Sequence, residues 1–185
     1  MDRLYFRPLI IEDKEQLLYI YSDKDAMQYR GSKPLETIEE AENMVLQAHK
    51  EWDSRTKMRM AVIEKDTEVL IGTAMYFFES PTAVEIGFSI GRDFWKYGYG
   101  QEGTEGLMEF IKANEPEVTT IVGIARSGNE KSLKMMANIG FVEVSDYEVE
   151  GKRRFELMVN SLQFLPSAIR IAYHVEPHYY ACHTI

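Results

Sequence analysis

Residues 93–103 hold the pattern that points most directly to chemistry, because Gly98 and Gly100 stand between a strand-like run and a long helical pattern. Glycine at the start of a helix lets backbone N–H groups converge on an anion without interference from Cβ atoms, and the helix dipole adds a favourable field. A pyrophosphate could therefore bind at this turn. Gly-x-Gly alone is also typical of a tight turn that only serves the backbone. The loop does not follow a parallel first strand, as the dinucleotide motif does, and no Walker-type G-K-[ST] sequence is present.

Hydrophobic periodicity predicts the elements that must position this loop. The predicted order is β-α-α-β-β-β-α-β-α-β-β. The strands cover residues 4–9, 59–64, 69–79, 84–90, 119–125, 141–150 and 153–159, and the helices cover residues 10–21, 37–52, 99–112 and 129–139. Because a helix connects the fourth and fifth strands, these two should lie parallel in an otherwise antiparallel sheet. The predicted fold class is α/β (α+β), with a mixed, mostly antiparallel sheet of about seven strands flanked by about four helices.

Local signals mark several of these boundaries. Thr37 and Glu40 fit a capping box, so Thr37 should be the N-cap of the second helix. Gly140 should end the last helix. Gly151 and Lys152 should form the turn of a closing hairpin.

Length and composition favour one globular domain. The chain has 185 residues, of which 45% are hydrophobic and 28% charged, as in ordinary folded proteins. We assign residues 1–160 to the domain. Residues 161–185 show no clear period and are expected to form a C-terminal tail that packs on the domain or on a partner subunit, so that a monomer or a homodimer would be compatible with the sequence.

The charge of the chain argues against two classes of partner. Thirty acidic and 21 basic side chains give a formal net charge of −9, which opposes binding to nucleic acid and to anionic membranes. No basic stripe with interleaved aromatic residues is present, and no apolar run is long enough to cross a bilayer. The single cysteine, Cys182, and the lack of an apolar secretion signal lead us to expect a cytoplasmic protein.

The glycine loop is the second of three motifs that occur in order along the chain. They are EIGFSI at residues 85–90, WKYGYGQE at residues 95–102, and NEKS at residues 129–132 followed by NIGF at residues 138–141. Over residues 4–159 the sequence resembles the GNAT N-acetyltransferase family, and specifically its RimJ/RimL-like branch of ribosomal-protein acetyltransferases. Two positions depart from that branch. Lys96 stands where the branch commonly has glycine, and Gly100 stands where it frequently has alanine.

The resemblance implies a fold, a cosubstrate and a reaction. In the GNAT fold the fourth and fifth strands splay apart in a V, and acetyl-coenzyme A lies in the gap. The acetyl group passes directly to a primary amine, either a protein N-terminus or a small molecule, without a covalent enzyme intermediate. The coenzyme-binding positions that the resemblance implies are Phe88, Ser89, Ile90, Trp95, Lys96, Tyr97, Gly98, Tyr99, Gly100, Gln101, Asn129, Lys131 and Ser132.

Two side chains are candidates for catalysis by this resemblance. Glu85 would act as the general base, directly or through water; the alternative is an outward-facing strand carboxylate or a salt-bridge partner. Ser132 would donate a hydrogen bond to the leaving thiolate, or it would only help to cap the helix that begins after Asn129. Many family members have a tyrosine as the acid at the position of Met136, which cannot donate a proton. This difference supports the alternative function, a non-catalytic acyl-coenzyme A binding or sensing module.

The remaining candidate residues are less specific. Four aromatic side chains could line an acceptor pocket or belong to the core, namely Tyr29, Tyr76, Phe77 and Phe78. His174, His178 and Cys182 have the i, i+4 spacing of metal ligands, but Pro177 interrupts a helix through them, so that no metal is expected.

Overall fold

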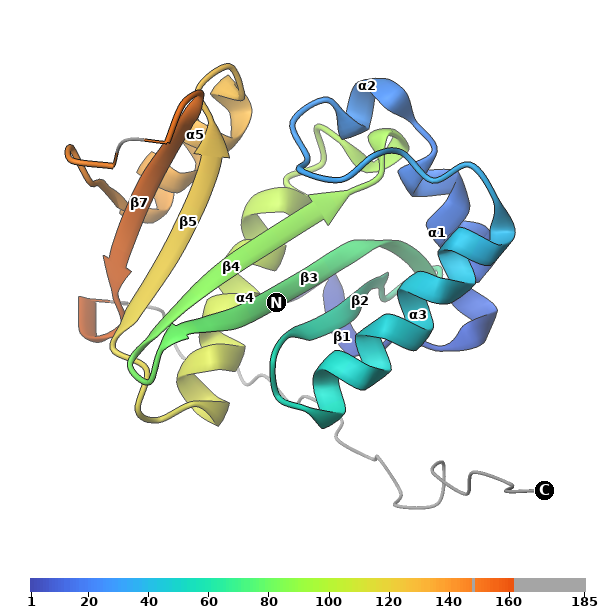
Figure 1. Cartoon of the computed structure of the whole chain (residues 1–185), viewed down its shortest axis with the longest axis horizontal. Helices are drawn as coiled ribbons and strands as arrows, with labels where there is room; N and C mark the ends of the chain where they lie inside the picture. The colour runs from blue at the N-terminus through green and yellow to red at the C-terminus, as the bar shows by residue number, and fades with distance from the viewer. Residues whose placement is uncertain (148, 162–185) are drawn as a thin grey trace.

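A single seven-stranded sheet forms the centre of the computed structural model, which describes residues 1–147 and 149–161 (Figure 1). The strands lie in the order β1-β2-β3-β4-β5-β7-β6, and every neighbouring pair is antiparallel except β4 and β5. The strands are β1 (Leu4–Pro8), β2 (Met58–Glu64), β3 (Val69–Ser80), β4 (Ala83–Ile90), β5 (Thr120–Arg126), β6 (Val142–Glu143) and β7 (Lys152–Met158). The predicted mixed sheet with a parallel fourth and fifth strand is confirmed.

Helices cover both faces of this sheet and enclose two apolar cores. The α-helices are α1 (Lys14–Tyr21), α2 (Lys24–Met27), α3 (Ile38–Asp53), α4 (Tyr99–Asn114) and α5 (Glu130–Ile139). Helices α1 and α3 pack on one face, where Leu17 and Val45 bury against Ala61. Helix α4 packs on the opposite face, where Leu107 and Ile111 join a larger core (Figure 1). The side that carries α1 and α3 is called the acceptor face below.

The predicted helix boundaries follow local side-chain chemistry. Glu40 N–H donates to Thr37 Oγ1 over 3.3 Å and Thr37 N–H donates to Glu40 Oε2 over 3.4 Å, which completes the capping box of α3. Asn129 caps α5, and Gly140 ends it with a φ of 103°, in the left-handed region that favours glycine. These predictions are confirmed.

The predicted closing hairpin is wrong in its first strand. A strand was expected over residues 141–150, but β6 contains only Val142 and Glu143, both exposed at the sheet edge beyond β7. The chain turns at residues 145–146, where the Ser145 hydroxyl donates to the neighbouring Asp146 carboxylate, and the strand does not continue. The short helix α2 was also missed, although Asp23 caps it by accepting from the N–H groups of Asp25 and Ala26.

The parallel pair β4 and β5 separates after a short ladder. Four residue pairs join the strands, from Ala83 with Thr120 to Ile86 with Gly123. Beyond Ile86, β4 continues to pair with β3, while β5 continues to pair with β7. The two strands therefore diverge and leave a V-shaped gap between them (Figure 1).

Three further expectations concern the C-terminal tail, metal binding and membrane-spanning segments. Residues 162–185, which make up nearly all of the predicted tail, lie outside the described residues, and so do His174, His178 and Cys182. Within residues 1–147 and 149–161 no group of three or more His, Cys, Asp or Glu side chains is arranged to hold a metal ion. In the same part of the chain no helix is long and apolar enough to cross a membrane.

Candidate active site

The gap between β4 and β5 exposes backbone groups of β4. The Ser89 carbonyl points to β3, because its oxygen lies 2.0 Å from the place that a Cβ atom would take if Gly72 had one. Gly91 N–H points the same way and donates to the carbonyl of Ile71 on β3 over 2.9 Å. Backbone groups of successive strand residues point to opposite edges. Those of Phe88 and Ile90 therefore point into the gap, where β5 no longer pairs with them. Their N–H groups are available to an acyl-pantetheine chain.

Trp95 joins the mouth of this gap to α5. Its indole Nε1 donates to the Ile90 carbonyl over 2.9 Å, so it occupies an acceptor on the free edge of β4. The Lys131 ammonium lies over the same indole ring, 4.6 Å from its centroid. The sequence-predicted residues Ile90, Trp95 and Lys131 are thus brought together.

The glycine loop begins α4 at the end of this gap. Gly98 is the N-cap residue and adopts a left-handed conformation with a φ of 81°. Lys96 is left-handed as well, with a φ of 74°, which is uncommon for a residue with a side chain. This conformation explains why glycine suits the position in the resembled branch. A left-handed residue next to a helix start turns N–H groups toward a common point, which is the geometry of an anion-binding nest.

Arg3 holds the loop in place from the N-terminus of the chain. It donates from Nη1 to the Tyr97 carbonyl and from Nε to Glu102 Oε2, each over 2.8 Å, and it stacks over the Tyr99 ring at 4.5 Å. Partial burial opposes the effect, but the hydrogen bonds and charge of Arg3 lower the pKa of Glu102 below its ordinary value. Sequence reasoning missed Arg3 and Glu102.

Ion pairs and a hydrogen bond also connect the 3-10 turn before the glycine loop with the helices of the acceptor face. Arg92, in the 3-10 turn Arg92–Phe94 before the loop, pairs with Asp23 and, over 2.8 Å, with Asp25. The Tyr19 hydroxyl donates to Asp93 over 2.5 Å. The first two helices and the loop are therefore held together.

Glu85 lies on the acceptor face, one residue before the strands separate. It pairs with Phe77 on β3 and with Val122 on β5, and its side chain is half-buried. Burial raises the pKa of Glu85 above its ordinary value and the charge of Glu79 raises it further, while Arg154 and Lys152 oppose the change. Within the described residues Glu85 forms no hydrogen bond or ion pair, because Arg154 is taken by Glu79 at 2.9 and 2.7 Å and by Glu156.

Ser132 and Asn129 lie on the other side of the gap. The Asn129 side-chain oxygen accepts the Ser132 N–H over 3.2 Å, which caps α5. The Ser132 hydroxyl is half-buried and makes no hydrogen bond within the described part of the chain. Met136 is buried, with Sδ 2.7 Å from the position of a Cβ on Gly123. A thioether therefore stands at the apex of the gap, because Gly123 belongs to the last pair before the strands diverge.

The four aromatic candidates divide between the two faces. Tyr76 packs in the core under α4, donates to Glu115 over 2.7 Å and contacts the Phe78 ring at 6.2 Å. Phe77 faces the other way and lines a hollow on the acceptor face. The Tyr29 ring lies across the mouth of the gap, since Cε1 is 3.6 Å from the position of a Cβ on Gly128. Phe77 and Tyr29 therefore lie outside the core under α4.

Comparisons with known proteins agree with this geometry. The family model of the acetyltransferase (GNAT) domain matches residues 3–142. The chain is 24% identical over 168 residues to the uncharacterised N-acetyltransferase p20 of Bacillus licheniformis, a match that covers 87% of this chain and 93% of that protein.

Solved structures share the fold at low sequence identity. Spermidine N-acetyltransferase from Vibrio cholerae, in complex with CoA and spermine, has a TM-score of 0.72 at 17% identity and covers 86% of this chain and 98% of its own. Ribosomal-protein-S5-alanine acetyltransferase from Vibrio fischeri has a TM-score of 0.70 at 18% identity and covers 87% and 96%.

The mixed sheet, its divided fourth and fifth strands and the glycine turn define an acyltransferase domain of the GNAT type. The chain belongs to the acetyltransferase (GNAT) family, whose model matches most of its length.

Proposed function

We propose that this protein is an N-acetyltransferase that moves an acetyl group from acetyl-coenzyme A to a primary amine. The observation that carries the proposal is the continuity of the binding groups. The free N–H groups of Phe88 and Ile90 lead along the gap to the left-handed turn at Gly98. The N–H groups along the gap suit an acyl-pantetheine chain, and the turn at Gly98 suits a pyrophosphate.

The coenzyme-binding roles follow from these positions. The turn over residues 95–101 would hold the pyrophosphate through backbone N–H groups, with Lys96 and Lys131 adding positive charge. Phe88 and Ile90 would bind the pantetheine amide and the acetyl carbonyl. Asn129 would contact the pantetheine with its side-chain N–H₂, since the side-chain oxygen already caps α5.

The transfer is a single displacement in a ternary complex. Glu85 accepts a proton from the incoming ammonium, directly or through water, and the neutral nitrogen attacks the thioester carbon. The new C–N bond forms as the C–S bond breaks, and the sulfur leaves as a thiolate that the Ser132 hydroxyl stabilises by donating a hydrogen bond. The amine proton that remains in excess passes to solvent or to the thiolate.

The named activities of two relatives support an amine as the acceptor. One solved relative is a spermidine N-acetyltransferase and another acetylates the alanine of a ribosomal protein, as their names state. The similarity to the latter supports placement of this chain in the RimJ/RimL-like branch, and a soluble cytoplasmic enzyme of this kind would meet either acceptor.

An assay of thiol release tests the proposed function. The protein is mixed with acetyl-coenzyme A and a panel of primary amines, and free coenzyme A is measured, with affinity for the coenzyme determined by calorimetry. Turnover with at least one amine supports the enzyme. Tight binding of acetyl-coenzyme A without any turnover would instead establish the sensing module that the missing tyrosine at Met136 suggests.

Alanine at Gly98 should weaken coenzyme A binding about tenfold, whereas alanine at Gly100 should leave it within about twofold. A Cβ in the left-handed region costs roughly 1–2 kcal/mol, and about 1.4 kcal/mol corresponds to a factor of ten. Around Gly98 the nearest atom to a new Cβ is Arg3 Nη2 at 3.6 Å, so the backbone alone decides the effect. A Cβ at Gly100 would meet only Met135 Sδ at 3.7 Å. Equal loss in both variants, measured by calorimetry, would contradict the assigned role of the turn.

A further inference from the structure

A guanidinium without an acidic partner lies on the acceptor face. Arg59, on β2, shares this face with Ala61 and is half-buried. Its only hydrogen bond within the described residues runs from Nη2 to the thioether of Met75 over 3.6 Å, and no carboxylate in that part of the chain pairs with it. Sulfur is a weak acceptor, and a guanidinium has five N–H donors to satisfy. A group of this kind is expensive to bury unless an anion meets it.

Arg30 adds a second cation beside the first. Its guanidinium stacks over the ring of Tyr21 at 4.3 Å, and it forms no ion pair within the described residues. The Tyr21 hydroxyl bonds Thr73, which stands two residues before Met75 on the same strand and face. Burial is the main cause that lowers the pKa of Arg59, and the positive charge of Arg30 adds to it. The positive charges of Arg30 and Arg59 therefore lie on the same part of the acceptor face.

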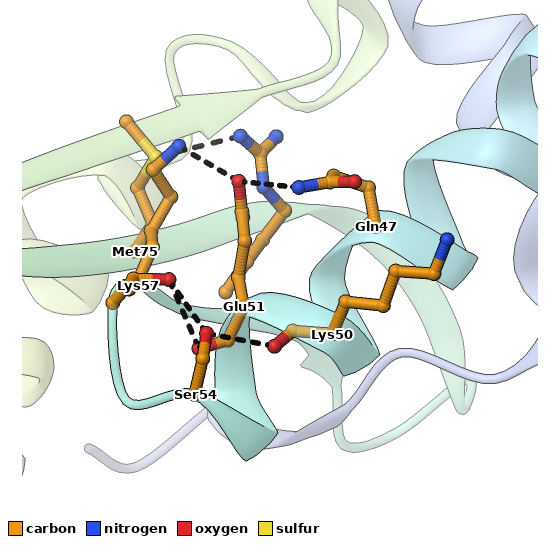
Figure 2. A network of polar contacts seen from close by, with 8 residues as sticks. Gln47, Lys50, Glu51, Ser54, Lys57 and Met75 are labelled. Atoms are coloured by element: carbon orange, nitrogen blue, oxygen red, sulfur yellow. Dashed lines mark hydrogen bonds and ion pairs between the residues drawn. The ribbon is translucent and has the colours of Figure 1, made fainter.

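An acidic side chain that acts on Arg59 is already engaged. The negative charge of Glu51, on α3, raises the pKa of Arg59 and so opposes the effect of burial. However, Glu51 Oε1 accepts from Lys57 Nζ and from Gln47 Nε2, each over 3.2 Å (Figure 2). Glu51 is therefore paired with Lys57, and within the described residues neither Arg59 nor Arg30 forms an ion pair with a carboxylate.

This positive charge stands close to the strand that lines the gap. Met75 Sδ is 3.6 Å from Arg59 Nη2, and it is also 3.6 Å from the position of a Cβ on Gly87. The Met75 side chain therefore contacts both Arg59 and the surface of β4 at Gly87. Gly87 is the first residue of β4 beyond the ladder with β5 and lies on the same face as Glu85. An anion bound to Arg59 would therefore lie on the same face of the sheet as an amine placed beside Glu85.

We propose that the acetyl acceptor is an amino acid, whose carboxylate is bound by Arg59 with the help of Arg30 while its amine faces Glu85 and the thioester. This inference rests on the proposed function and narrows its substrate class. A hollow on this face is lined by Met75 and Phe77 together with Glu51, Thr56 and Lys57, and its Met75 and Phe77 side would take an apolar side chain. A polyamine, which carries positive charges only, would be repelled by Arg59 and Arg30.

Matched acceptors test the proposal directly. Each pair contains an amino acid and the amine that lacks its carboxylate: L-phenylalanine with phenethylamine, and γ-aminobutyrate with propylamine. Values of kcat/KM are compared at equal concentrations of free amine. We expect the wild type to prefer the amino acid at least about tenfold in one pair, which is the worth of a charge-assisted hydrogen bond. Arg59→Met should abolish the preference and change the rate with the plain amine less than about twofold, and Arg59→Lys should restore part of it.

Binding of the reaction products separates this proposal from the proposed function. Calorimetry with N-acetyl-L-phenylalanine and with N-acetylphenethylamine, in the presence of coenzyme A, needs no turnover. Stronger binding of the acid, lost in Arg59→Met, supports the carboxylate subsite even if no amine is acetylated. Turnover of amines without any preference for a carboxylate, or equal losses for both members of a pair in Arg59→Met, overturns the subsite and leaves the acetyltransferase intact. Circular dichroism checks folding, and Arg30→Met serves as the second variant if Arg59→Met unfolds.

Discussion

Glu85→Gln is expected to lower kcat/KM for acetyl transfer about 100-fold at a pH below the pKa of the acceptor amine, because the variant cannot accept the ammonium proton. Glutamine keeps the size and polarity of the side chain. The loss should shrink as pH rises above the amine pKa, where the acceptor is already neutral. It should also shrink below the raised pKa of Glu85, where the wild-type carboxyl is protonated. A full pH profile of kcat/KM for both proteins measures this window, and a pH-independent ratio would remove Glu85 from the role of base.

The same substitution should not destabilise the fold at neutral pH. The pKa of Glu85 is raised in the folded protein by burial first and by Glu79 second. The folded state therefore binds more protons than the unfolded state between the ordinary and the raised pKa, and the stability of the wild type falls as pH rises through that range. Glu85→Gln removes this penalty. We expect an equal or higher Tm at neutral pH, with the difference fading in acid, so that slow turnover accompanies a well-folded protein.

Two carboxylates provide controls for this experiment. Glu117 is exposed in the loop before β5, and Glu117→Gln should leave the pH profile unchanged. Glu79→Gln removes the charge that helps to raise the pKa of Glu85 and frees Arg154 from its partner. Both changes lower the pKa of Glu85, so the acid limb of the Glu79→Gln profile should move to lower pH.

Gly72→Ala is expected to lower the free energy of unfolding by about 2 kcal/mol or more, within the range of overpacked cores. A Cβ at this position would lie 2.0 Å from Ser89 O, 2.9 Å from Ser89 C and 3.0 Å from Ile90 Cα. All three are backbone atoms of β4, so no rotation of a side chain can relieve the contact. The strand itself must move toward the gap, and coenzyme affinity should fall with stability.

Gly31→Ala is the matched control for Gly72→Ala. No atom lies within 4 Å of a Cβ at Gly31, and its φ is not in the left-handed region. Urea denaturation should give a change below about 0.5 kcal/mol, as for other surface substitutions. Similar stability of the two variants would show that β3 and β4 are farther apart at Gly72 than the structure has them.

Much of the fold could be predicted because its signals are local. Thr37 with Glu40 and Gly140 mark helix ends through contacts within a few residues, and the helix from Tyr99 follows from periodicity. The parallel pairing of β4 and β5 follows from a helix between two strands. The gap itself came only from the family resemblance, since no local rule states where two paired strands separate.

The contacts that complete the site could not be predicted, because they join distant parts of the chain. Arg3 and Glu102 are 99 residues apart in the sequence, and only the folded arrangement of the N-terminus beside α4 brings them into hydrogen-bond distance. Arg59 and Met75 stand on neighbouring strands, and no pattern in the sequence indicates that the guanidinium donates to a thioether and not to a carboxylate. The strand predicted over residues 141–150 failed for a different reason. Its composition is compatible with a hairpin, but the edge of the sheet offers too little apolar surface to support more than Val142 and Glu143 as a strand.

The short ladder between β4 and β5 has a thermodynamic consequence. Within the described residues, the four pairs from Ala83 to Ile86 are the whole backbone ladder that connects the β1–β4 half of the sheet with the β5–β7–β6 half. The amides of a pantetheine chain in the gap could form hydrogen bonds with the edges of β4 and β5, as a strand between them would. The cosubstrate would then add hydrogen bonds between two halves that already share an apolar core, so its binding would also raise the stability of the domain.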